Sequence, residues 1–174
     1  MAWAERAAIH GLIGAPNIES HETTEHVPIG TIVAATGRPL SGTGSRRSTG
    51  EFIYLRGVAS TQEGELVRYT AANGVTVRNT ETAGAAWPLA VAMAATVANE
   101  FGWYQISGYA LVRKTAVPIA GGSKLYQSET VGSVEAVASA TFEVHGCRVA
   151  ATTSTSTSAT YVLAYINRPH MEGQ

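Results

Sequence analysis

Aspartate is absent from this chain of 174 residues, and all 13 acidic residues are glutamates. The residue that commonly builds calcium loops, magnesium sites and Ser–His–Asp triads is therefore missing. Cys147 is the only cysteine, so one chain can form neither an internal disulfide nor a cysteine metal cluster. No run of 18 apolar residues indicates a membrane span. We expect a protein without enzymatic activity, cofactor, metal site or membrane partner.

Charge is also scarce. Charged residues make up 14% of the chain, well under the usual ~25%. The net charge of −1 and the pI of about 6.5 argue against direct nucleic-acid binding. Lysine occurs only twice, against ten arginines. Because protein interfaces are poor in lysine and rich in arginine, this bias favours a surface that faces other proteins.

The first 27 residues differ from the rest in composition. They hold three of the five histidines and little regular apolar pattern, and no signal peptide is indicated. With a single cysteine, this suits synthesis in a reducing cytoplasm. We predict an extended, subunit-contacting N-terminal arm over residues 1–27 and a β domain over residues 28–174, which we expect to stay folded without the arm. The predicted apolar anchors of the arm are Trp3, Ile9, Leu12 and Ile18.

From residue 28 onward, short apolar runs recur about every 8–12 residues with turn signals between them. The strongest strand pattern is residues 51–58, and Asn73-Gly74 is typical of a two-residue hairpin turn. The Ala-rich segment 87–97 is interpreted as a buried strand, and Arg168-Pro169 is expected to stop the final strand. The pattern predicts an all-β fold, a small antiparallel β-sandwich or barrel.

Three arginines stand in or beside a glycine-rich stretch of low apolar content over residues 37–50, which is predicted to be a long loop or hairpin excursion. Their guanidinium groups suit inter-subunit ion pairs with glutamates, and the alternatives are solvation of the loop and binding of a phosphate or nucleic acid. The predicted partner-binding residues here are Arg38, Arg46 and Arg47.

Three groups of residues have chemical interpretations. His21 and His26 miss both spacings of zinc-protease helices by one residue, so a solvated or interface arm is favoured, and an adventitious or structural metal held by His21, Glu22 and His26 is the alternative. Cys147 follows His145 by two residues, but no Asn or Asp is placed to orient the base, which favours a packed cysteine. A hydrolase would have to use Glu143 with His145. The aromatic segment 101–104 is interpreted as core, with a sugar-stacking platform as the alternative.

Several segments resemble the head decoration, or cement, proteins of tailed bacteriophages. The most specific are Gly50–Ser60 (GEFIYLRGVAS) and Val97–Gly108 (VANEFGWYQISG). Shorter ones are Ile29–Val33, Pro88–Met93 and the Arg168-Pro169 ending, all in the right order. Residues 1–27, the arginine loop and residues 145–160 lie outside the resemblance.

The resemblance implies a structural protein of the virion. Such proteins bind the outer capsid surface and stiffen the shell by bridging neighbouring major capsid proteins, often as homotrimers. The implied partners are the major capsid protein and further copies of the chain. The alternative is a carbohydrate- or receptor-binding module of the virion surface, and it would require Trp103 and Tyr104 to be exposed beside polar groups.

Overall fold

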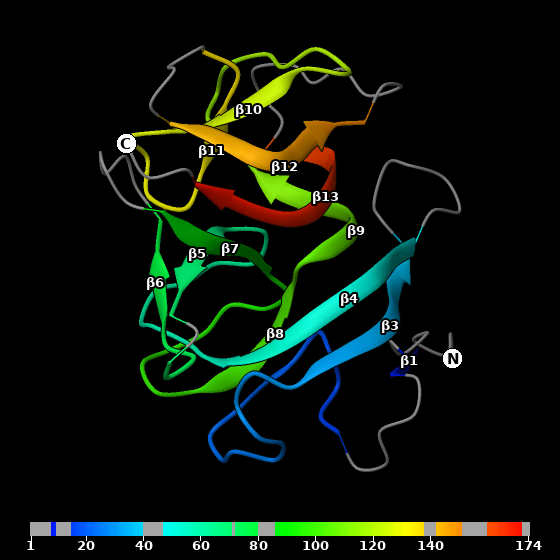
Figure 1. Cartoon of the computed structure of the whole chain (residues 1–174), viewed down its shortest axis with the longest axis vertical. Coiled ribbons are helices and arrows are strands. Elements are labelled where there is room, and N and C mark those ends of the chain that lie inside the picture. Colours follow the sequence, from blue (N-terminus) through cyan, green and yellow to red (C-terminus); the bar gives the residue numbers. More distant parts are fainter. Residues whose placement is uncertain are drawn as a thin grey trace.

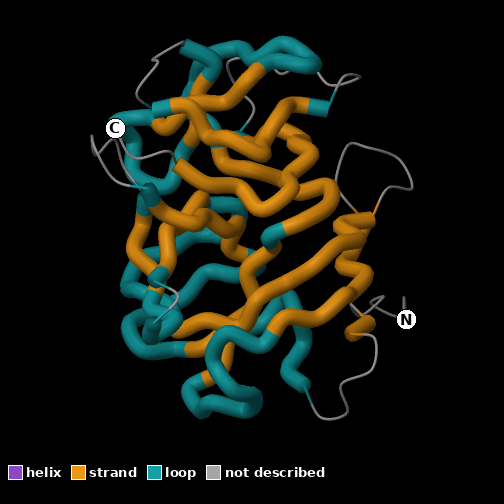
Figure 2. Tube along the Cα trace, viewed as in Figure 1, coloured by secondary structure: helices purple, strands orange, loops and turns teal. Residues whose placement is uncertain are grey.

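The computed structural model describes residues 8–9, 15–39, 47–70, 72–79, 86–137, 142–150 and 160–171. Within these ranges every regular element is a β-strand and none is a helix (Figure 2). A helix long and apolar enough to cross a membrane is accordingly not found among the described residues. The predicted all-β class is confirmed. The strands are β1 (Ala8–Ile9), β2 (His21–Glu22), β3 (Ile32–Pro39), β4 (Arg47–Arg56), β5 (Leu66–Tyr69), β6 (Thr76–Arg78), β7 (Trp87–Ala92), β8 (Phe101–Gln105), β9 (Ser107–Arg113), β10 (Lys124–Gln127), β11 (Val134–Glu135), β12 (Glu143–Val149) and β13 (Tyr161–Met171).

The strands form one antiparallel sheet that folds over on itself into two layers (Figure 1). Its main path runs β1-β3-β4-β8-β7-β13-β12-β10-β11, with β2 beside β8, β5 and β6 beside β7, and β9 beside β13. Strand β7 joins the layers, because it pairs with β8 and β5 and also, through Trp87 and Pro88, with β13. Over the described residues the sheet is not closed, so of the two predicted architectures the sandwich fits.

Strand β4 is buried on both faces. Successive side chains of a strand point to opposite sides, and the four consecutive residues Phe52, Ile53, Tyr54 and Leu55 are all buried. Ile53 and Leu55 pack with residues of β5, β7 and β8 inside the sandwich. Phe52 and Tyr54 pack on the other face of the sheet, together with Trp103 of β8. That second face therefore needs a cover of its own.

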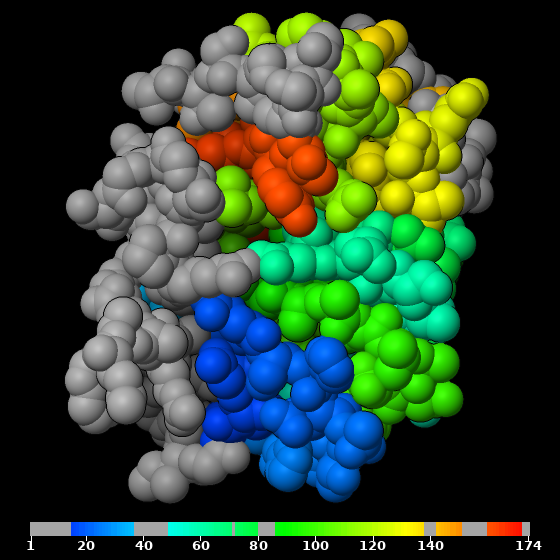
Figure 3. Space-filling view, turned by 180° about the vertical axis from the view of Figure 1, so that it is seen from behind, coloured from blue at the N-terminus to red at the C-terminus, as the bar shows by residue number. Residues whose placement is uncertain are grey.

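Residues 15–27 provide this cover. Ile18 and Val27 are buried in the cluster that contains Phe52 and Trp103. The Trp103 indole Nε1 donates a hydrogen bond of 3.1 Å to the Pro16 carbonyl oxygen, and β2 pairs with β8. Figure 3 shows this segment, in blue, lying against the lower half of the molecule. Residues 15–27 thus belong to the packed β domain, and the boundary predicted at residue 27 does not separate two units there.

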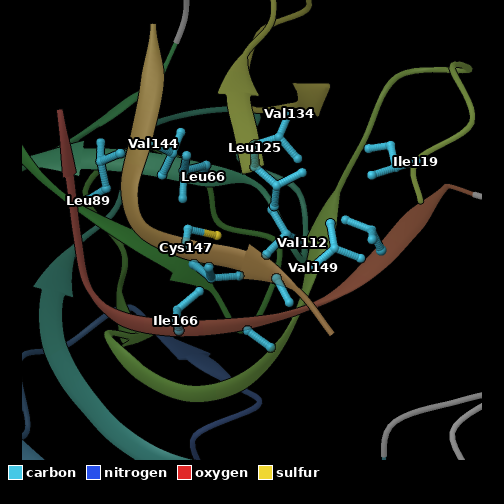
Figure 4. Close-up of a cluster of buried hydrophobic side chains, with 14 of the residues drawn as sticks. Leu66, Leu89, Val112, Ile119, Leu125, Val134, Val144, Cys147, Val149 and Ile166 are labelled. Carbon is cyan, nitrogen blue, oxygen red and sulfur yellow. The ribbon is translucent and has the colours of Figure 1, made fainter. Parts of the chain in front are cut away.

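A further cluster of buried side chains fills the space between the layers (Figure 4). Leu66 and Leu89 reach it from β5 and β7, while Val144 and Cys147 reach it from β12. All four side chains are buried. This cluster holds the outer strands β9, β10, β12 and β13 against the rest of the sheet, and so it fixes which face of those strands remains open to solvent.

Two glycines allow β4 to cross β9 at close range. A Cβ on Gly50 would lie 1.7 Å from the Ser107 carbonyl oxygen, and one on Gly108 would lie 2.1 Å from the Thr49 carbonyl oxygen. Gly108 also has a φ of +100°, a backbone conformation that favours glycine. No other residue type fits this crossing without displacing the backbone.

The end of the chain differs from the prediction. Arg168-Pro169 was expected to stop the last strand, yet β13 continues to Met171. It accommodates the proline through an irregularity opposite β12: Cys147 pairs with Ile166, whereas His145 pairs with His170. Arg168, at this bulge, has a φ of 48°. Proline cannot donate a ladder hydrogen bond, but strand pairing is interrupted at a bulge, so none is required there.

Candidate functional site

The predicted partner-binding residues fall into four groups. Trp3, Leu12 and Arg46 lie outside the described residues. Ile9 lies in β1, which pairs with β3. Arg38 and Arg47 lie near the joined ends of β3 and β4, where Pro39 pairs with Arg47. The described backbone therefore brings two of the three predicted arginines to one end of a hairpin. Ile18 forms the fourth group.

Ile18 was predicted to anchor the arm on a neighbouring subunit. Its side chain is instead fully buried within the cluster formed with Phe52 and Trp103 of the same chain. A residue without exposed surface cannot contact a partner unless the fold opens, so Ile18 is a core residue. The sequence pattern did not reveal the burial of Ile18, because the residues that bury it, Phe52 and Trp103, lie far along the chain.

The aromatic segment of β8 is core, as favoured from the sequence. Trp103 and Tyr104 are each about 1% exposed, on opposite faces of the strand. Burial raises the pKa of the Tyr104 hydroxyl. Neither ring presents a surface on which a sugar could stack, so the sugar-binding interpretation does not apply to these two residues.

The histidine-rich segment does not gather ligands for a metal. His21 lies in β2, with Nε2 at 3.4 Å from Oε2 of Glu100, while His26 is exposed five residues along the chain. Among the described residues, no three His, Cys or Glu side chains converge as a metal site would require. His21 thus contacts Glu100 where β2 pairs with β8.

Cys147 is a packed residue of the inner cluster. It is buried and free of disulfide bonds, and desolvation raises the pKa of its thiol to about 12. The thiolate is the nucleophilic form of cysteine, so this environment disfavours the reactive species. His145, two residues earlier, does not make it a nucleophile.

Cys147 should resist alkylation in the folded protein. At pH 9, close to the ordinary thiol pKa, an exposed cysteine would be about half ionised, whereas a thiol with a pKa near 12 stays protonated. Iodoacetamide labelling followed by mass spectrometry should therefore proceed at least about 100-fold more slowly in buffer than in denaturant. Equal labelling rates in the two solutions would contradict the buried position.

Strands β9, β10, β12 and β13 form the layer that we call the outer layer. Its solvent-facing side carries a row of polar and aromatic side chains that the sequence did not reveal. Strand pairing sets Lys124 opposite Arg148, Arg148 opposite Tyr165 and Tyr165 opposite Tyr109. All four residues are exposed, while their neighbours Leu125, Cys147, Ile166 and Ala110 point into the core. The row crosses β10, β12, β13 and β9 in that order. We call it the Arg148–Tyr165 row, comprising Lys124, Arg148, Tyr165 and Tyr109.

The two tyrosines of the row contact each other. Their ring centroids are 5.5 Å apart and their planes meet at 68°, an edge-to-face arrangement that aromatic pairs favour. Tyr165 is 50% exposed and Tyr109 is 37% exposed. The contact holds the Tyr165 ring in place while leaving half of its surface open to solvent.

A groove lies beside Tyr165, at the irregularity between β12 and β13. Its volume is about 290 Å³. Gly146 has a φ of 68° there, and a Cβ at this position would lie 2.5 Å from the Asn167 carbonyl oxygen. The imidazoles of His145 and His170 stack nearby with centroids 5.6 Å apart. The residues that line the groove are Glu143, Val144, His145, Gly146, Cys147, Arg148, Tyr165 and Asn167.

The charged side chains that line the groove differ in whether they form an ion pair. The Lys124 Nζ donates to Oε2 of Glu143 at 2.7 Å, so the one carboxylate among the described residues that line the groove already has a cation. Within the ranges that the structure describes, no carboxylate pairs with the Arg148 guanidinium. Glu143 and His145 both line the groove, but the engagement of Glu143 by Lys124 leaves it poorly placed to act as a general base.

Comparisons with known proteins add no assignment: no model of a protein family matches the chain, and no curated protein matches its sequence.

Proposed function

We propose that this chain is a structural virion protein that binds the outer surface of a bacteriophage capsid and stabilises the shell by bridging neighbouring major capsid proteins. The observation that carries the proposal is the position of the two most specific resembling segments. Gly50–Ser60 contains most of β4, and Val97–Gly108 contains all of β8. These strands pair with each other from Phe52 opposite Gln105 to Arg56 opposite Phe101.

The pairing matters because the segments are far apart in the sequence. Two segments in unrelated parts of the fold could resemble one family independently of each other. These two segments instead lie side by side at the centre of one layer, so they resemble the family as one structural unit. The side chains that carry the pattern, including Phe52, Tyr54 and Trp103, are buried. The similarity thus concerns residues that determine a fold, which supports a shared architecture and, with it, a shared role.

A non-catalytic role accords with the chemistry of the described residues. The histidine, cysteine and glutamate side chains considered for catalysis are either buried, paired or dispersed. A subunit that bridges several capsid proteins can use contacts that are weak one by one. Once its first contact has formed, its other contacts form at a high effective concentration. The hairpin end that carries Arg38 and Arg47 is the proposed contact with the major capsid protein, and we propose that the protein assembles as a homotrimer.

The direct test mixes the purified protein with undecorated shells. Cryo-electron microscopy should reveal added density on the outer surface, and the decorated shells should resist heat better than bare ones. Reversing the charge of the hairpin end (Arg38→Glu with Arg47→Glu) should weaken attachment by about tenfold, because charged residues at an interface guide association.

Arg56→Glu is the matched control, since Arg56 lies at the opposite end of β4. It should bind shells like the unaltered protein. The proposal fails if the folded protein leaves the shells bare and their heat resistance unchanged. Equal binding of the Arg38/Arg47 variant and the control would remove the hairpin end from the contact.

A further inference from the structure

We propose that the groove beside the Arg148–Tyr165 row binds an acidic saccharide, with the sugar ring on Tyr165 and its carboxylate on Arg148. This inference does not depend on the proposed capsid attachment, because it rests on the open face of the outer layer. It names a second surface, distinct from the β3–β4 hairpin, through which the protein would contact glycans.

The first support is the aromatic surface. Tyrosine combines an apolar ring face with a hydroxyl group, which suits partners that are apolar on one side and polar on the other. A pyranose has this character, because its C–H groups gather on one face and its hydroxyls lie at the rim. Tyr165 offers a half-exposed ring, and the edge contact with Tyr109 fixes its orientation. The ring is therefore prepared to stack before a ligand arrives.

The second support is the Arg148 guanidinium, which pairs with no carboxylate in the part of the chain that the structure describes. Arg148 lies directly opposite Tyr165 across the β12–β13 pairing and lines the same groove. Guanidinium groups bind carboxylates in a planar, two-pronged geometry. Glu143 does not compete for Arg148, since Lys124 holds it at 2.7 Å. A saccharide that carries a carboxylate would thus supply the partner that the described residues do not.

The third support is size and polarity. Sites for drug-sized ligands commonly have volumes of about 300–1,000 Å³, so a groove of about 290 Å³ suits a single sugar unit of a longer chain. Asn167 and the Glu143 carboxylate line it with groups that can bond to hydroxyls. Gly146 lines the groove without a side chain, because a Cβ at this position would lie 2.5 Å from the Asn167 carbonyl oxygen.

Single-stranded nucleic acid also combines stacking surfaces with negative charge, but the observations favour a saccharide. Non-specific binding of a nucleic-acid strand requires a cationic groove that follows several phosphates. Here one cation of the row, Lys124, is neutralised by Glu143, and the chain has a net charge of −1. The Arg148 guanidinium, to which no described carboxylate is paired, matches one carboxylate per sugar better than a continuous phosphate backbone.

The experiment titrates the isotopically labelled, full-length protein with trigalacturonate and follows amide shifts by NMR. The matched ligand control is the methyl ester of trigalacturonate, which retains the rings and loses the charge. The expected shifts centre on β12 and β13, with the acid bound about tenfold more tightly than the ester. A thymidine oligonucleotide of similar charge should bind at least tenfold more weakly than the acid.

Three variants separate the contributions. Arg148→Gln should lower affinity for the acid about tenfold and leave affinity for the ester unchanged, whereas Tyr165→Ser should weaken both. Arg56→Gln, in the other layer, should change neither. Thermal melting verifies that each variant is folded. The proposal is overturned if the folded protein binds neither saccharide, if the shifts lie away from the groove, if Arg148→Gln affects acid and ester alike, or if the oligonucleotide binds most tightly.

Discussion

A variant that lacks residues 1–27 should fail to form the cooperative β domain. The sequence alone suggested the opposite, that residues 28–174 would remain folded without their predecessor. The structure contains the reason for the difference: Ile18 and Val27 are buried against Phe52, Tyr54 and Trp103. Removing the segment would expose three large aromatic side chains on one sheet face and would break the hydrogen bond from Trp103 to Pro16.

The size of this effect can be tested first at one residue. Replacing a fully buried isoleucine with alanine costs about 2–5 kcal/mol, because transfer energy is lost and a cavity remains. Ile18→Ala should therefore lower the free energy of unfolding, measured by urea denaturation, by about that amount. Against a total stability of about 5–15 kcal/mol for a typical domain, the complete deletion should leave a chain without a cooperative transition.

Ile32→Ala is the matched control for this prediction. It is the same substitution at an isoleucine of β3 that is 44% exposed, and it should cost less than about 1 kcal/mol. If the deletion variant unfolds cooperatively at the urea midpoint of the full chain, residues 15–27 are dispensable and the predicted boundary at residue 27 is restored. Similar losses from Ile18→Ala and Ile32→Ala would place Ile18 outside the core.

Local patterns in the sequence predicted individual strands well. The apolar run 51–58 lies largely in β4, and Asn73-Gly74 forms the turn between β5 and β6, where Gly74 has a φ of 59°. The Ala-rich segment 87–97 begins with the buried strand β7, although that strand ends at Ala92. These features depend on residues close together in the chain, where alternation and turn chemistry act directly.

Features that depend on distant pairing were not accessible from the sequence. The Arg148–Tyr165 row exists only because β10, β12, β13 and β9 lie side by side, and their order along the chain gives no hint of that neighbourhood. Tyr109 and Tyr165 are separated by 56 positions in the printed sequence, yet pairing places them opposite each other. Likewise, the sequence marked Ile18 as an anchor on a neighbouring subunit and did not reveal that it packs with Val27 inside the same chain, because a covering segment of polar composition needs only a few apolar contacts.

The second large effect is expected at a buried ion pair. Glu65 is about 1% exposed, and its carboxylate accepts hydrogen bonds from Arg78, at 2.8 Å from Nε and 2.6 Å from Nη2. This hydrogen bonding raises the pKa of the Arg78 guanidinium. The turn at Gly132 closes over the carboxylate so tightly that a Cβ there would lie 2.5 Å from the Glu65 Cδ. The two-pronged contact joins the start of β5 to the end of β6.

Arg78→Met should destabilise the protein by about 3–5 kcal/mol, because it leaves the Glu65 carboxylate buried without its cation. The exposed pair of Lys124 and Glu143 supplies the control: Lys124→Met, with Lys124 46% exposed, should cost less than about 1 kcal/mol. The double variant Glu65→Leu with Arg78→Met should be more stable than Arg78→Met alone, since no charge then remains buried. Urea denaturation of the unaltered protein and the three variants measures these losses, and equal losses from Arg78→Met and Lys124→Met would show that the Glu65 carboxylate reaches water when its partner is removed.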